Sequence, residues 1–182
     1  MMTRNYRVFL AAVCIPALLL VMSGTASAAC PDLNNPDPMS VAPDVRIPGT
    51  AKIGAGTTIM TGAHIGSYTS TGTCSTVADN GSLGSRSDIG SLATVSTDAG
   101  LGQYAWLGYA STLGDRSHLG AYAKVLHNTT IGTDTTIGQR ANIGANVTIG
   151  NGVHIGGYAT VCDGAVIGDG VSVAYRGKYG CY

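Results

Sequence analysis

The chain has 182 residues, with ten basic and ten acidic side chains and a formal net charge of zero at pH 7. Charged residues make up only 11% of the sequence, and every acidic residue is an aspartate because the chain contains no glutamate. Proteins that bind nucleic acid or an anionic membrane surface through charge are strongly basic. The composition therefore predicts neither of these partners.

Residues 1–28 predict a secretory signal peptide. Two arginines precede an apolar run at residues 8–22, and Ala26-Ser27-Ala28 provides a small-residue cleavage site. The apolar run is too short to predict a membrane span. Cleavage predicts a secreted protein, or one in the periplasm or cell envelope. The alternative is lipidation of Cys30, although Ser27-Ala28-Ala29 lacks the large aliphatic residue expected ahead of such a cysteine.

The rest of the chain divides into three predicted parts. Residues 29–40 are rich in proline and predict an N-terminal cap, residues 41–174 carry a regular repeat, and residues 175–182 form a C-terminal tail. Open strand edges invite polymerisation, and proline and cross-linked tails blunt them. Both ends of the repeat are therefore predicted to be covered.

An aliphatic residue returns at every sixth position from Val41 to Val173, without insertion or deletion, and Thr71 is the only polar member of the series. The residue two positions earlier is nearly always small or β-branched, and the residue that follows is usually glycine. Side chains of a strand alternate faces, so the aliphatic and the small residue point inward and the residue between them points to solvent. A fixed short period of this length predicts a solenoid of short strands and corners.

This pattern resembles the hexapeptide-repeat family, and the resemblance covers residues 41 to about 175. It implies an all-β fold, a single left-handed parallel β-helix of seven to eight triangular coils, with three hexads in each coil of 18 residues. The left-handedness is implied by the family alone, because general rules would favour a right-handed crossover.

Four cysteines remain after the predicted cleavage, which suggests two disulfides in an exported chain. Three pairings are open. A separation of 19 residues is about one coil and favours Cys162–Cys181, which leaves Cys30–Cys74 to tie the N-terminal segment to the first coils.

Residues 18 apart are expected to stack, which predicts two outward columns with a structural and a functional interpretation each. Outward threonines suit strands, but they also resemble the ice-binding face of threonine-rich β-solenoids. A column of tyrosine and arginine can stabilise itself through cation–π contacts, or it can bind a glycan or a partner protein. The first column comprises Thr58, Thr76, Thr94, Thr112, Thr130 and Thr148, and the second comprises Tyr68, Arg86, Tyr104, Tyr122, Arg140 and Tyr158.

The resemblance also implies two enzymatic alternatives. Many hexapeptide-repeat proteins are trimeric acyltransferases with a histidine base, for which His127 and His118 are the candidates here. The repeat lacks the protruding loop and the helical C-terminal extension common in those enzymes, and export removes the chain from cytosolic acyl-CoA. A γ-class carbonic anhydrase would need histidines that converge on zinc, but His118 and His154 are expected about 10 Å apart. No metal ligand set and no cofactor is predicted.

These observations favour a non-catalytic structural or binding scaffold that acts through its flat faces. The partner is an unidentified surface, glycan or protein, and the protein is a monomer or a homotrimer. A trimeric acyltransferase and an ice-binding protein remain the alternatives.

Overall fold

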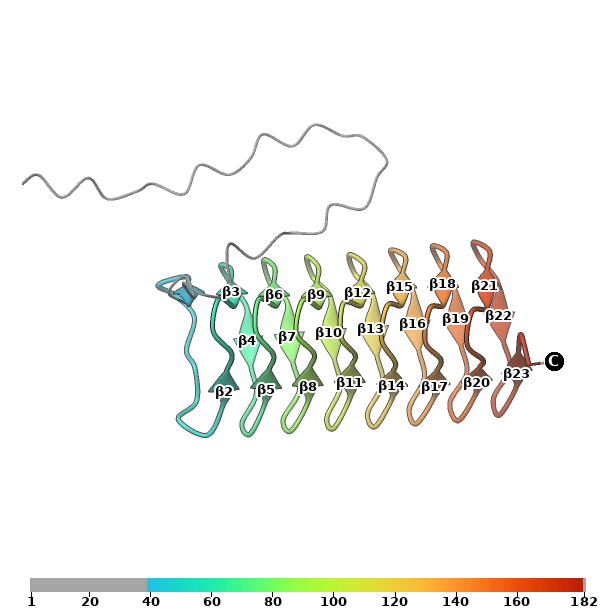
Figure 1. Ribbon diagram of the computed structural model, residues 1–182, viewed down its shortest axis with the longest axis horizontal. Coiled ribbons are helices and arrows are strands. Elements are labelled where there is room, and N and C mark those ends of the chain that lie inside the picture. Colours follow the sequence, from blue (N-terminus) through green and yellow to red (C-terminus); the bar gives the residue numbers. More distant parts are fainter. Residues whose placement is uncertain (1–38, 182) are drawn as a thin grey trace, which may run out of the picture.

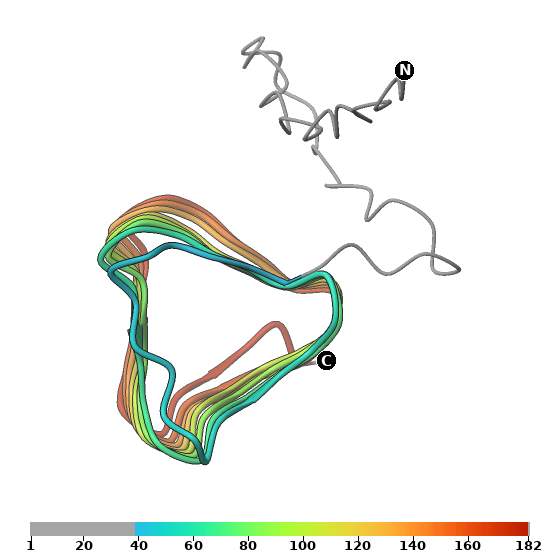
Figure 2. The ribbon, with the colours of Figure 1, turned by 90° about the vertical axis from the view of Figure 1, so that its left-hand side faces the viewer.

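The computed structural model describes residues 39–181, which form one straight prism of triangular cross-section (Figures 1 and 2). The predicted signal peptide, Cys30 and most of the predicted N-terminal cap lie outside these residues. Twenty-three strands of two residues each build the prism, and residues 39–181 contain no helix. No helix able to cross a membrane is therefore found in this part of the chain.

The strands form three parallel sheets, one on each side of the prism. Sheet A contains β1 (Ser40–Val41), β3 (Thr58–Ile59), β6 (Thr76–Val77), β9 (Thr94–Val95), β12 (Thr112–Leu113), β15 (Thr130–Ile131), β18 (Thr148–Ile149) and β21 (Val166–Ile167). Sheet B contains β2 (Lys52–Ile53), β5 (Ser70–Thr71), β8 (Asp88–Ile89), β11 (Trp106–Leu107), β14 (Lys124–Val125), β17 (Asn142–Ile143), β20 (Thr160–Val161) and β23 (Lys178–Tyr179). Sheet C contains β4 (His64–Ile65), β7 (Ser82–Leu83), β10 (Gly100–Leu101), β13 (His118–Leu119), β16 (Thr136–Ile137), β19 (His154–Ile155) and β22 (Ser172–Val173).

Every strand pairs with the strand 18 residues further along the chain, so equivalent residues of successive coils stack directly. Thr94 lies opposite Thr112, and its N–H donates to the carbonyl of Ser111 at 2.9 Å. The same register runs through all three sheets, whose strands stack along the prism in Figure 1. The predicted triangular coil of three hexads is confirmed.

The core is a stack of the aliphatic residues at the sixth positions. Leu107, Leu113 and Ile137 are fully buried, and the small residues two positions earlier are buried with them. Several of these small residues are hydroxylic, and Ser117 and Thr129 donate to backbone carbonyls of the next coil at 2.7 and 2.8 Å. The buried hydroxyls thus bond to the backbone of the neighbouring coil in addition to the strand hydrogen bonds.

The repeat differs from its predicted form at both ends. Ile47 fits the six-residue count but forms no strand, so sheet C begins one coil later, at β4. At the other end the coil extends past the predicted boundary at residue 174, because Tyr179 occupies the next sixth position and β23 pairs with β20. The chain then turns inward across the end of the prism (Figure 2).

The disulfide between Cys162 and Cys181 is confirmed, with the two Cα atoms 5.2 Å apart. It fastens the last residues to the preceding coil. Cys74 is also disulfide-bonded. Its predicted partner, Cys30, lies outside the described residues, so the Cys30–Cys74 pairing stays a prediction.

Candidate functional site

The tyrosine and arginine column lies on the corner between sheet C and sheet B, where each coil makes a two-residue turn. We call it the Tyr–Arg ladder; it comprises Tyr68, Arg86, Tyr104, Tyr122, Arg140, Tyr158 and Arg176. All seven residues have positive φ, between 56° and 60°. This left-handed conformation is unfavourable for bulky side chains. The sequence pattern did not indicate that tyrosine and arginine adopt it here.

The other two corners handle the same backbone conformation differently. Between sheets A and C, the positive-φ residues are Gly62, Asn80, Asp98, Arg116, Asp134, Gly152 and Gly170. Glycine, asparagine and aspartate tolerate this conformation best. The corner between sheets B and A uses glycine or asparagine in four coils, including Gly56 and Asn128, and Cys74, Leu92 and Ala110 in the other three. The ladder uses none of the three tolerant residue types in any of its seven coils.

Neighbouring ladder side chains stack on one another along the prism axis. The rings of Tyr104 and Tyr122 lie parallel, with centroids 4.8 Å apart. The Arg86 guanidinium lies between the rings of Tyr68 and Tyr104, at 5.5 and 5.4 Å from their centroids. Arg140 is held in the same way, 5.4 Å from the Tyr122 ring and 5.5 Å from the Tyr158 ring. The predicted cation–π ladder is confirmed.

This stacking determines which atoms the ladder presents to solvent. The ring faces inside the stack are covered by neighbours, so hydroxyl groups, ring edges and guanidinium edges face outward. Arg86 donates to the Tyr104 hydroxyl, and Arg140 donates to the Tyr158 hydroxyl at 2.7 Å. The first of these hydrogen bonds raises the pKa of Arg86 above its ordinary value. The result is a row of cationic and hydroxylic groups.

Sheet B continues this surface with residues that the sequence analysis missed. Trp106, the only tryptophan, points outward from β11, and the Lys124 ammonium lies 4.5 Å from the centroid of its ring. Tyr109, in the turn that follows β11, is 51% exposed. The 18-residue register that pairs Trp106 with Lys124 is visible in the sequence and would have revealed this contact.

Charge is divided between two corners of the prism. The outward residues of sheet B and the ladder carry Lys52, Arg86, Lys124, Arg140, Arg176 and Lys178, with Asp88 as their acidic neighbour. The corner between sheets A and C, which we call the acidic corner, carries Asp44, Asp79, Asp98, Asp115, Asp134 and Asp169. Within residues 39–181 the one ion pair joins Arg116 to Asp134, at 2.7 Å, on this acidic corner. A net charge of zero conceals this separation.

Comparisons with known proteins support the same architecture. Residues 110–145 match the family described as bacterial transferase hexapeptide (six repeats). The same six-residue repeat runs from Val41 to Val173 of this chain. No curated protein matches its sequence.

Two solved structures share the left-handed β-helix of this hexapeptide-repeat protein. One is a UDP-N-acetylglucosamine O-acyltransferase from Moraxella catarrhalis, with a TM-score of 0.54 and 20% identity over 72% of this chain and 66% of that chain. The other is a UDP-N-acetylglucosamine acyltransferase with a TM-score of 0.57 and 16% identity over 78% of this chain. The repeat protein spans 66% of the length of each, and at these identities the likeness establishes the fold alone.

The threonine column lies on sheet A, the side of the prism opposite the ladder. Its six members stack in register from Thr58 to Thr148, and Val166 follows them with 69% exposure. The predicted outward rank is therefore present. Its interpretation as an ice-binding face stays a prediction.

The two candidate histidines lie on different parts of the prism. His118 points outward from sheet C, whereas His127 lies in the turn between sheets B and A, and both are exposed. His118 leans over Gly100: a Cβ on that glycine would lie 3.0 Å from His118 Nδ1 and 2.6 Å from Ser82 Oγ. Within residues 39–181, no three His, Cys, Asp or Glu side chains are grouped so as to hold a metal ion.

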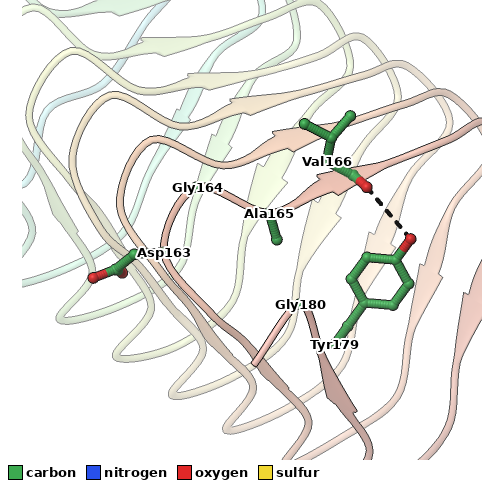
Figure 3. A pocket seen from close by; sticks show the side chains of 6 residues that line it. All are labelled: Asp163, Gly164, Ala165, Val166, Tyr179 and Gly180. Atoms are coloured by element: carbon green, nitrogen blue, oxygen red, sulfur yellow. Dashed lines mark hydrogen bonds between the residues drawn. The ribbon is translucent and has the colours of Figure 1, made fainter. Parts of the chain in front are cut away.

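A cleft of about 470 Å³ lies at the C-terminal end of the prism, beside the tail (Figure 3). Tyr179 crosses it, and its hydroxyl donates to the carbonyl of Val166 at 3.3 Å. The other lining residues are Asp163, Gly164, Ala165 and Gly180. The cleft is far along the prism from the middle of the ladder and holds neither candidate histidine.

Proposed function

We propose that this hexapeptide-repeat protein is a rigid binding scaffold that holds an extended partner along the Tyr–Arg ladder and the adjoining face of sheet B. One observation carries the proposal. Seven successive corner residues with positive φ are all tyrosine or arginine, whereas ten of the fourteen positive-φ residues at the other two corners are glycine, asparagine or aspartate. Strained backbone positions of this kind cluster at functional sites.

Energetics support the same conclusion. Each left-handed residue with a bulky side chain costs about 1–2 kcal/mol, and an exposed cation–π contact returns only about 0.5–1 kcal/mol. Stacking within the ladder offsets part of that cost, while glycine or asparagine would remove the cost altogether. Tyrosine, tryptophan and arginine are also the residues that contribute most to binding at interfaces.

The scaffold is proposed to act outside the cytosol. The signal peptide predicted at residues 1–28 supports this location, and so does the Cys162–Cys181 disulfide, because disulfides persist in oxidising compartments.

A panel of immobilised neutral and acidic glycans tests the proposal. Tyr104 and Tyr122 are both changed to asparagine, which suits the left-handed backbone and preserves the fold. The matched control changes Thr94 and Thr112 to alanine on sheet A. Binding to the panel is expected to fall at least tenfold in the tyrosine variant and to stay unchanged in the control, since aromatic hot-spot residues each contribute more than 1 kcal/mol. Binding lost in the threonine variant but kept in the tyrosine variant would reject the ladder as the site.

Acyl transfer is the second candidate function, and the position of His118 favours it. Its Nδ1 atom and Ser82 Oγ both lie close to Gly100, 3.0 and 2.6 Å from the place of a Cβ on that glycine, so an exposed imidazole that can act as a base stands near a hydroxyl. His118→Ala is expected to lower the rate of acyl transfer from acyl-CoA to a sugar hydroxyl by about 100-fold or more, while His127→Ala leaves it unchanged. Absence of turnover in the unaltered protein would reject this candidate.

A further inference from the structure

We infer that the partner of the ladder is an acidic polysaccharide, a chain of sugar rings that carries carboxylates at intervals. This inference rests on the proposed binding function. It follows from three features of the described residues: unpaired cations in a row, ring faces that are already covered, and charge of the opposite sign on a different corner.

The ladder cations have no carboxylate partner. Arg86, Arg140 and Arg176 are exposed, and none forms an ion pair within residues 39–181. Arg86 and Arg140 each direct Nη1 to a tyrosine hydroxyl, which leaves donors at Nε and Nη2 for an incoming oxygen. Guanidinium groups bind carboxylates through such paired donors.

The spacing of these cations suits a polymer with repeated charges. Arg86 and Arg140 are three coils apart, which is about 14 Å, and Arg140 and Arg176 are two coils apart, which is about 10 Å. Tyrosine hydroxyls lie between them in the column. A straight row in which one or two tyrosine hydroxyls separate successive cations matches a chain that offers carboxylates separated by hydroxyls.

The covered ring faces argue against single-stranded nucleic acid. Proteins that bind it stack successive bases on free aromatic faces. Here Tyr104 and Tyr122 already stack on each other, and guanidinium groups cover faces of Tyr68 and Tyr158. A polysaccharide can instead bind to the exposed edges through hydrogen bonds.

The arrangement of the sheets argues against an acidic peptide. An extended peptide commonly binds by adding a strand to an open sheet edge. The edges of the three sheets lie only at the two ends of the prism, at strands such as β1 and β23, and not along the ladder.

A second copy of the chain is also less suited to the ladder. Several carboxylates of the acidic corner already accept hydrogen bonds from their own backbone: Asp115 from Thr97 N at 3.1 Å and Asp169 from Asn151 N at 2.7 Å. Asp134 is paired with Arg116. An external polyanion avoids this competition, and repulsion from the acidic corner directs it to the ladder.

The experiment measures binding of the mature protein to size-defined polygalacturonate oligosaccharides by calorimetry at low and physiological salt. The test variant changes Arg86 and Arg140 to glutamine. The matched control, Arg116→Gln, removes a positive charge from the acidic corner. The test variant is expected to lose about tenfold in affinity, since exposed ion pairs contribute modestly and add along the row. The control is expected to bind unchanged, and salt should weaken binding of the unaltered protein.

The remaining outcomes overturn the inference, and they separate its failure from that of the binding function. If neutral dextran binds as tightly as polygalacturonate, and the variant of Tyr104 and Tyr122 loses this binding, the acidic ligand is rejected and the scaffold function stands. Equal or tighter binding of polyglutamate or oligothymidylate would show that the ladder accepts any polyanion and reject the polysaccharide. An equal loss in Arg116→Gln would reject the ladder as the charged site. If the unaltered protein binds none of these probes, and the tyrosine variant binds the glycan panel as the unaltered protein does, both proposals are rejected.

Discussion

At the scale of single residues, Thr71 explains why one polar side chain can replace an aliphatic one in the core. It is only 5% exposed, and its hydroxyl accepts a hydrogen bond from Gly54 N at 3.1 Å and lies 3.4 Å from the Thr57 hydroxyl. Thr57 is in turn 3.2 Å from the Ser75 hydroxyl. The exception to the repeat is therefore part of a small buried hydroxyl network, in which each member has a partner.

We expect Thr71→Val to destabilise the protein by about 1–2 kcal/mol, although it restores the aliphatic pattern. The hydroxyl is lost while its partly buried partner at Gly54 N stays in place, and leaving such a group unsatisfied costs this much. Urea unfolding of the variant and of the unaltered protein measures the difference. A higher unfolding midpoint in the variant would contradict the role of the network.

The Arg116–Asp134 pair predicts a specific effect of pH. The hydrogen bond from Arg116 lowers the pKa of Asp134. A lowered folded-state pKa gives stabilisation that is present above the unfolded pKa, and so at neutral pH, and that is lost as the pH falls through the folded pKa. In Arg116→Gln the pKa of Asp134 should rise toward its ordinary value, as measured by NMR titration. Both side chains are more than half exposed, so the change in stability is expected to be small. An unchanged Asp134 titration would contradict this account.

At the scale of the strand and its corner, glycine after the aliphatic residue lets successive coils approach closely. A Cβ on Gly114 would lie 2.5 Å from the carbonyl oxygen of Gly132 in the next coil. Gly168 occupies the same column in the last coil of sheet A, and a Cβ there would meet nothing within 4 Å. The requirement for glycine thus comes from the neighbouring coil and not from the turn itself. Ala78 and Ser96 in the same column indicate that the backbone can adjust.

Gly114→Ala is expected to cost about 1–3 kcal/mol, the usual range for an overpacked site. Gly168→Ala should leave stability within about 0.5 kcal/mol of the unaltered protein. Thermal unfolding of the two variants side by side makes the comparison, and equal effects would show that coil contact is not the cause.

Most of the strand and corner structure could be predicted from the sequence. A period of six with inward aliphatic residues fixes which side chains enter the core. The strands, their register and the ladder contacts follow from residues 6 or 18 apart, and the Cys162–Cys181 bridge follows from a separation of 19 residues, about one coil. The left-handed backbone of the ladder could not be predicted, because tyrosine and arginine usually avoid that conformation. The separation of the basic ladder and sheet B from the acidic corner was overlooked, because the net charge is a sum over the whole sequence. No strand forms at Ile47 because the next residue is Pro48, which lacks the N–H that the equivalent residue Ala42 donates to Ile59 O in the next coil.

At the scale of the whole molecule, the prism is a stack in which each coil contacts only its neighbours. The two end coils therefore determine whether the prism can associate with another chain end to end. At the C-terminal end, β23 adds one strand to sheet B and the tail then crosses the core. The backbone hydrogen bonds that join this segment to the preceding coil include those from Thr160 N to Gly177 O at 2.8 Å and from Cys162 N to Tyr179 O at 3.0 Å. The Cys162–Cys181 disulfide adds a covalent link between the same two coils.

Replacing both Cys162 and Cys181 with serine should release the end of the stack. Hydrogen exchange of the backbone amides at positions 160 and 162 is expected to accelerate tenfold or more, because closing a loop of this size contributes about 3 kcal/mol. Exchange at Trp106 N, in the middle of the prism, serves as the internal control and should not change. Equal protection at Thr160 in both proteins would show that β23 is held by its own contacts. Association of the variant at high concentration, measured by light scattering, would follow from the uncovered edge.

The uninterrupted register places a constraint on the gene. Loss or gain of six codons would preserve the alternation of core and surface, yet it would rotate every later column by one side of the prism and break the ladder. Only changes in multiples of eighteen codons keep both the core and the columns aligned. Length variation among alleles is therefore expected in whole coils, and a lineage that used its surface differently could arise from a six-codon step.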